Sequence, residues 1–211
     1  MNYFITGTDT GAGKTYVTSL LLQSLLAEGR TAVGYKPICC GDREDAEALL
    51  SASTPAPQLA IDRVNPIHFK TPAAPIVATM IENRAVDLGL IQENYAQLAA
   101  EFDHVLVEGI GGWEVPITTG YNVAELAVDF ALPVLLVVDN RLGALNHSIL
   151  TARAIAARGL ECAGIFLNHV EEERDSASVS NRVILEQELK IPILADILHG
   201  ETAIDWPFLA R

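Results

Sequence analysis

Positive charge is the feature that this sequence has least of. Its 14 lysines and arginines stand against 27 aspartates and glutamates, so the formal net charge is -13 at pH 7. Phosphate backbones and anionic lipid headgroups repel such a chain, which argues against a nucleic acid or a membrane as partner. The sequence holds only four lysines, and two of them, Lys14 and Lys36, come just after the first two predicted strands. Cations at those places indicate an anionic ligand.

Cysteines and long apolar runs are scarce as well. The three cysteines, Cys39, Cys40 and Cys162, form no C-x-x-C pair, and this usage is typical of a reducing compartment. No apolar stretch reaches the roughly 20 residues of a membrane-spanning helix, and no secretion signal precedes the first predicted strand. These absences predict a cytoplasmic protein.

The N-terminal region carries a phosphate-binding motif. Residues Gly7–Thr15 read Gly-Thr-Asp-Thr-Gly-Ala-Gly-Lys-Thr, between the apolar run Tyr3–Thr6 and a segment with leucines at helical spacing. In a strand, glycine-rich turn and helix of this kind, backbone N–H groups point at phosphate, Lys14 adds a positive charge and the Thr15 hydroxyl suits Mg²⁺. The leading glycine lies one place earlier than in the usual G-x-x-x-x-G-K-[ST] pattern, so this is a variant loop.

Short apolar strands alternate with helical patterns along the chain, of which 50% is hydrophobic. We expect helices near residues 14–28, 44–50, 88–102, 122–130, 145–158 and 176–189, and strands near 3–6, 31–35, 104–107, 132–138, 162–167 and 191–195. We expect a loop at 38–42, an irregular excursion at 51–75, and a C-terminal tail of loop and short helix. This alternation predicts an α/β fold, a single domain over residues 1–211 with a doubly wound, mainly parallel sheet flanked by helices, like P-loop nucleotide-binding proteins.

Polar side chains follow several predicted strands, and in such sheets ligands bind at the carboxyl ends of the strands. Glu108 follows an apolar strand, where P-loop enzymes place an acid on the metal side; a turn or capping acid is the alternative. Asp45 fits a surface acid as well as a ligand. Together Thr15, Asp45 and Glu108 offer Mg²⁺ the oxygen ligands that it prefers. The residues alone therefore predict a Mg²⁺-dependent nucleotide enzyme or switch with a second active lysine, Lys36.

Four blocks of the sequence resemble the dethiobiotin synthetase family: Gly7-Thr8-Asp9-Thr10…Gly13-Lys14-Thr15, Gly34-Tyr35-Lys36-Pro37, Val107-Glu108-Gly109-Ile110-Gly111-Gly112-Trp113 and Leu142-Gly143-Ala144-Leu145-Asn146-His147. The displaced leading glycine is also a feature of this family. The resemblance implies an ATP-dependent ring closure in biotin synthesis. In that reaction 7,8-diaminononanoate and CO₂ form a carbamate, ATP phosphorylates it to a mixed anhydride, and the second amine closes a cyclic urea, releasing ADP and phosphate.

The resemblance also implies a role for individual residues. The catalytic residues would be Lys36, which stabilises the carbamate and mixed anhydride, Lys14, which bridges the phosphoryl group and the carbamate, and Thr10. Contacts to ATP would come from Gly11, Ala12, Gly13, Lys14, Thr15, Tyr16, Gly109, Ile110, Gly111 and Asn168, with Asn168 reading adenine. Substrate contacts would come from Thr10, Lys36, Cys40, Leu142, Gly143 and Asn146. The Mg²⁺ ligands would be Thr15, Asp45 and Glu108.

The sequence departs from the family pattern at three places, one of which is Asp196-Ile197-Leu198-His199, where the proline of the family's adenine-side loop is absent. Cys40 stands where the family often has a small hydroxyl residue, and a thiol is the poorer hydrogen-bond donor. Gly11 stands where a bulkier or acidic residue is common, so a side-chain contact is absent there.

The resemblance further implies a homodimer with its active site near the interface, where residues 142–146 offer a helix N-terminus to the substrate carboxylate from the other subunit.

Two other classes of protein share the variant phosphate-binding loop. A partition or septum-positioning ATPase usually carries an extra lysine early in the loop, where this chain has Thr8-Asp9-Thr10. A cobyrinate-amidating synthetase normally arrives with a fused glutaminase domain, for which we expect no room in 211 residues.

Overall fold

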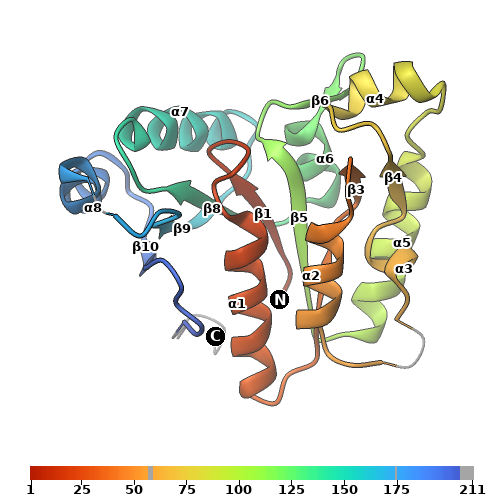
Figure 1. The fold of residues 1–211 in the computed structure, drawn as a ribbon, viewed down its shortest axis with the longest axis horizontal. Helices are drawn as coiled ribbons and strands as arrows, with labels where there is room; N and C mark the ends of the chain where they lie inside the picture. The colour runs from red at the N-terminus through yellow and green to blue at the C-terminus, as the bar shows by residue number, and fades with distance from the viewer. Residues whose placement is uncertain (57–58, 174, 205–211) are drawn as a thin grey trace.

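A parallel sheet forms the centre of the fold (Figure 1) in this computed structural model, which describes residues 1–56, 59–173 and 175–204. The sheet has six strands in the order β10-β9-β8-β1-β5-β2, and all neighbours pair in parallel. The strands are β1 (Tyr3–Gly7), β2 (Ala32–Tyr35), β5 (His104–Gly112), β8 (Val134–Asp139), β9 (Cys162–Asn168) and β10 (Ile193–Ile197). The predicted α/β fold with a mainly parallel sheet is confirmed.

Helices connect and cover these strands. They are α1 (Lys14–Ala27), α2 (Glu44–Ala52), α3 (Ile61–Val64), α4 (Pro75–Glu82), α5 (Leu88–Glu101), α6 (Val123–Phe130), α7 (Ala144–Ala157) and α8 (Ser176–Glu188). Figure 1 shows α1 and α2 side by side in front of the sheet. Strands β1 and β2 are buried at every residue, as expected for parallel strands with helices on both faces. Among the described residues, no helix has the length and hydrophobicity needed to cross a membrane.

The position of β1 in the sheet determines where a ligand can bind. β1 lies between β8 and β5, and the chain leaves it for the β2 edge before it returns to the other side. Such a reversal of strand order leaves a crevice at the carboxyl ends of the strands. The glycine-rich loop 8–13 begins directly at that end of β1.

Several local predictions were wrong. Residues 38–42 are not all loop, because β3 (Ile38–Cys40) pairs in parallel with β4 (Ile67–Phe69). The expected irregular excursion 51–75 therefore contains β4, preceded by α3, and α4 was not predicted at all. Strands of three residues are too short to show a periodic pattern, and they form here through pairing between distant segments.

The remaining differences concern element ends. Strand β5 continues from the predicted end at Val107 to Gly112, and a short hairpin follows, formed by β6 (Pro116–Thr118) and β7 (Tyr121–Asn122). Strand β10 begins and ends later than predicted. In the tail, residues 198–204 form no helix, and residues 205–211, where the predicted short helix would fall, lie outside the described residues.

Candidate active site

The glycine-rich loop turns from β1 into α1 with two residues in the left-handed region, Gly11 at φ 80° and Gly13 at φ 83°. Gly13 has a second reason to be glycine, because a Cβ there would lie 2.1 Å from Nδ2 of Asn168. The Lys14 side chain turns back over this loop, and its Nζ lies 3.4 Å from the carbonyl oxygen of Asp9. The free N–H groups at the start of α1 and the Lys14 ammonium thus face the same space, as phosphate binding requires.

Lys36 follows the end of β2 and is held at both its backbone and its side chain. Its backbone N–H donates to the carbonyl oxygen of Val64 at 2.9 Å, and its carbonyl accepts from Nδ2 of Asn65 at 2.8 Å. Its ammonium lies 2.7 Å from Oε1 of Glu108 and 2.8 Å from Oδ2 of Asp45. The second lysine is therefore buried and pointed inward rather than solvated.

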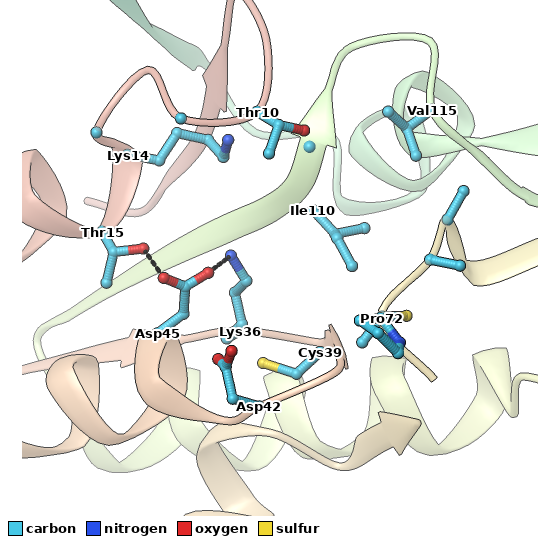
Figure 2. Close-up of a pocket in the computed structure, with 16 residues that line it drawn as sticks. Thr10, Lys14, Thr15, Lys36, Cys39, Asp42, Asp45, Pro72, Ile110 and Val115 are labelled. Carbon is cyan, nitrogen blue, oxygen red and sulfur yellow. Dashed lines mark hydrogen bonds and ion pairs between the residues drawn. The ribbon is translucent and has the colours of Figure 1, made fainter. Parts of the chain in front are cut away.

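The three predicted metal ligands converge on one point. Oγ1 of Thr15 lies 2.7 Å from both Oδ1 of Asp45 and Oε1 of Glu108. Thr18, one turn further along α1, donates to the other oxygen of Glu108 at 2.8 Å. Glu108 is fully buried, so these polar contacts offset the cost of removing its carboxyl group from water. Asp45, whose position in the sequence fits a surface acid equally well, belongs to this cluster (Figure 2).

The charged groups in this cluster shift one another's pKa values. Burial and, after it, the nearby positive charge of Lys36 lower the pKa of Lys14 to about 8. Burial also acts to lower the pKa of Lys36, but the carboxylates of Glu108 and Asp45 outweigh it and raise the pKa above its ordinary value. Burial acts to raise the pKa of Asp45, yet Lys36 and its hydrogen bond keep the pKa below the usual value. Lys36 is consequently a permanent cation.

A cavity of about 630 Å³ opens above these groups. Ten predicted site residues line it: Thr10, Gly11, Gly13, Lys14, Thr15, Lys36, Cys40, Asp45, Ile110 and Gly111. Both lysines reach it, so the structure brings together the two ammonium groups that sequence order placed at one edge of the sheet (Figure 2). Burial raises the pKa of the Cys40 thiol to about 11, so this thiol lines the cavity as a neutral group.

Sequence reasoning missed six residues of the cavity wall: Cys39, Asp42, Pro72, Ala73, Ala74 and Val115. Cys39 and Asp42 come from β3 and the turn after it, and residues 72–74 lie between β4 and α4. The only sequence signals for them were the Gly-Asp turn and the run Thr71-Pro72-Ala73-Ala74-Pro75. Neither pattern shows that its segment folds against the glycine-rich loop.

Asn168 and Tyr16 lie on the other side of the glycine-rich loop. They line a separate cavity of about 270 Å³ together with Gly13, His169, Val170, His199 and Gly200. Nδ2 of Asn168 donates to the carbonyl oxygen of Ala12 at 3.0 Å. Oδ1 of Asn168 is buried and has no hydrogen-bond partner within the described chain. A buried acceptor without a donor is costly, so this atom suits a ligand that carries an N–H group.

The remaining predicted residues do not line the main cavity. Ala12 is buried, and Gly109 lies beneath the cavity, where its carbonyl oxygen is 3.4 Å from the Lys36 ammonium. Leu142, Gly143 and Asn146 are exposed at the start of α7. Within one chain the structure therefore does not bring these three α7 residues to the lysines.

The oxygen cluster meets the first requirement of a Mg²⁺ site. Its donors are a hydroxyl and two carboxylates, which are hard ligands, and each carboxylate lies 2.7 Å from the Thr15 hydroxyl oxygen. No group of three or more His, Cys, Asp or Glu side chains suited to a metal occurs among residues 1–56, 59–173 and 175–204. A site of three protein oxygens leaves coordination positions for phosphate oxygens and water, which is how Mg²⁺ is usually held beside a nucleotide.

Comparison with known proteins identifies the family. A family model described as an AAA domain (AAA_26) matches residues 1–202. The chain is 47% identical over 208 residues to the ATP-dependent dethiobiotin synthetase BioD of Akkermansia muciniphila, covering 99% of this chain and 97% of that protein. The chain belongs to the ATP-dependent dethiobiotin synthetase family. The BioD of Aromatoleum aromaticum is 40% identical, covering 93% of this chain and 90% of that protein.

The similarity of this chain to solved structures extends only to the fold. Chloroplast FtsY from Physcomitrella patens superposes with a TM-score of 0.58 at 22% identity, covering 97% of this chain and 61% of that one. The ParA family ATPase from Chlorobium tepidum superposes with a TM-score of 0.57 at 12% identity, covering 95% of this chain and 85% of that one. The likeness to the partition ATPases considered as an alternative is therefore one of architecture, whereas the sequence likeness is to dethiobiotin synthetases.

Proposed function

We propose that this protein catalyses the ATP- and Mg²⁺-dependent synthesis of dethiobiotin from 7,8-diaminononanoate and CO₂, in the cytoplasm. The observation that carries the proposal is the convergence of Lys14 and Lys36 on one cavity beside the glycine-rich loop. A carbamate meeting a triphosphate brings several negative charges together, and fixed ammonium groups stabilise them without reorganisation. Membership of the dethiobiotin synthetase family supports the same conclusion.

Each lysine has its own part in the proposed reaction. Lys36 stabilises the carbamate carboxylate and the mixed anhydride, and its position is fixed by Glu108 and Asp45. Lys14 lies at the start of α1 and bridges the carbamate and the transferring γ-phosphoryl group. The carbamate oxygen attacks the γ-phosphorus and ADP leaves. The second amine then attacks the carbamoyl carbon, phosphate leaves, and the amine loses a proton as the cyclic urea forms.

The other residues bind and orient the reactants. Thr10 lies at the cavity wall beside Gly111, where a Cβ on the glycine would be 3.4 Å from Oγ1 of Thr10. The Thr10 hydroxyl contacts the diamine or its carbamate. Gly11–Tyr16 wrap the phosphates, with Ile110 and Gly111 opposite. Asn168 offers its unpartnered Oδ1 to the adenine amino group.

Thr15, Asp45 and Glu108 would hold Mg²⁺ together with the phosphates. When bound, Mg²⁺ would neutralise charge on the β- and γ-phosphoryl oxygens. The protein residues themselves orient the phosphates and keep Lys36 directed at the cavity.

The exposed start of α7 supports the proposal of a homodimer. Gly143 has φ 95° and precedes a helix of 14 residues whose N-terminus has no side-chain cap, although the Ala144 N–H donates to the carbonyl oxygen of Arg141. Leu142, Gly143 and Asn146 are exposed and away from their own cavity, so we propose that they contact the substrate carboxylate in the partner subunit's site.

ADP release tests this function against a nucleotide switch. The purified protein should release ADP only when 7,8-diaminononanoate and bicarbonate are both present. An ATPase that ignores both additions would support the switch, which shares its architecture with this chain.

A further inference from the structure

Asp42 is the one acidic residue of the cavity wall to which neither the oxygen cluster nor the proposed mechanism gives a task. It lies in the turn between β3 and α2, and its carboxylate points toward Asp45 and Lys36 in Figure 2. The following inference rests on the proposed function and adds a substrate contact to it.

The residues on both sides of Asp42 are clamped. Gly41 donates its N–H to the carbonyl oxygen of Phe69 at 2.9 Å, and its own carbonyl oxygen lies 2.8 Å from Nε2 of His68. Gly41 has φ 92°, a turn that glycine adopts without strain. On the other side, the Arg43 guanidinium donates to Oδ1 of Asn65 at 3.0 Å and to the Asn65 carbonyl oxygen at 2.7 Å. Asp42 is therefore held in place from both sides.

The Asp42 carboxylate keeps free acceptor capacity. Its Oδ1 accepts one backbone N–H, from Glu44 at 3.2 Å, and no ion pair to Asp42 exists in the described part of the chain. The two carboxylates of the oxygen cluster, by contrast, are engaged. Asp45 contacts Thr15 and Lys36, and Glu108 contacts Thr15, Thr18 and Lys36. A cation entering the cavity finds its free counter-charge at Asp42.

The proposed substrate brings such a cation. Alkyl amines, like the lysine side chain, are protonated at neutral pH. Only the amine that receives CO₂ must be neutral at first, so the second amine enters as an ammonium and gives one proton to water before it attacks the carbamoyl carbon. Lys14 and Lys36 repel it, and the interaction of two like charges at close range costs binding free energy. We propose that Asp42 binds the ammonium of the amine that is not carbamylated and so directs the diamine into the site in one orientation.

The Asp42→Asn variant tests this contact with little change to the fold. An asparagine keeps an oxygen for the Glu44 N–H, and Glu44→Gln on the same turn is the matched control, since Glu44 is exposed and does not line the cavity. Loss of a charge-assisted hydrogen bond predicts a rise in the KM for the diamine of about tenfold or more. The KM for ATP, the Mg²⁺ concentration for half-maximal activity, and kcat should stay within about threefold.

Monoamine analogues identify the amine. 7-Aminononanoate and 8-aminononanoate each lack one amine and can be measured as competitive inhibitors. Asp42→Asn should weaken one of them about as much as it weakens the diamine and leave the other unchanged.

Three outcomes would overturn the inference. They are an unchanged KM for the diamine, equal effects on both monoamines, and a raised Mg²⁺ requirement, which would place Asp42 at the metal. If the natural protein forms no dethiobiotin, the proposed function itself fails; if it does and Asp42→Asn has the same KM, only this inference fails.

Discussion

Nζ of Lys36 lies 2.7 Å from Oε1 of Glu108, with the lysine side chain 3% exposed and the glutamate side chain 0% exposed. The same glutamate oxygen lies 2.7 Å from Oγ1 of Thr15. One buried carboxylate therefore fixes the direction of the ammonium group and belongs to the proposed metal site. Because burial of an unpaired charge is costly, each member of the pair depends on the other.

This dependence predicts the stability of variants at the pair. Glu108→Gln should lower the free energy of unfolding by about 3 kcal/mol, because it leaves a buried ammonium with only Asp45 as counter-charge. The double variant Lys36→Met/Glu108→Gln should recover part of that loss. Urea unfolding of the double variant and of the single variants Lys36→Met and Glu108→Gln measures these values. If the two single effects simply add in the double variant, the pair is not coupled as described.

Lys36→Ala should lower the rate of dethiobiotin formation by about two to three orders of magnitude, as expected for loss of a fixed positive charge at developing negative charge. Nucleotide binding should change little, because Lys36 faces the carbamate in the proposed reaction and Lys14 faces the phosphates. Product assays and calorimetric titration with ADP measure the two effects. Unchanged turnover would remove Lys36 from the mechanism.

Asp45→Asn should raise the Mg²⁺ concentration needed for half-maximal activity by about tenfold, because a neutral amide is a weaker ligand for a hard cation. Activity measured over a Mg²⁺ titration gives this value. Glu47→Gln, an exposed acid on the same helix that does not line the cavity, is the control. An unaltered Mg²⁺ requirement in Asp45→Asn would show that Asp45 only holds Lys36.

Gly13→Ala should weaken nucleotide binding by about tenfold or more, because its Cβ would displace Asn168, whose Nδ2 lies 2.1 Å away from that position. Gly11→Ala separates this clash from backbone strain. Gly11 also has positive φ, at 80°, but nothing lies within 4 Å of its Cβ position. Calorimetric titration should show the larger loss for Gly13→Ala, and equal losses would contradict a role for the Asn168 contact.

The sequence predicted most of the site because the chemistry was carried by residues at strand ends. Lys14 and Lys36 come after β1 and β2, and Glu108 lies in β5 directly after the predicted strand 104–107, so fold class alone places them at one edge of the parallel sheet. Asp45 was less certain, since nothing in a polar helix tells which acid faces the cavity. Its place became clear only from the packing of α2 beside α1.

The wall opposite the glycine-rich loop could not be predicted. Asp42 and Pro72 line the same cavity because β3 pairs with β4, and a three-residue pairing between distant segments leaves no periodic signal. Leu142 and Asn146 also could not be placed from one chain, because their proposed ligand lies in the partner subunit.

Transfer of labelled carbon tests the central claim most directly. With ¹³C-bicarbonate, 7,8-diaminononanoate, ATP and Mg²⁺, the natural protein should place the label in the ring carbonyl of dethiobiotin and release one ADP for each ring closed. Lys36→Ala should incorporate almost none under the same conditions. ATP hydrolysis by the natural protein without any labelled ring would contradict the account.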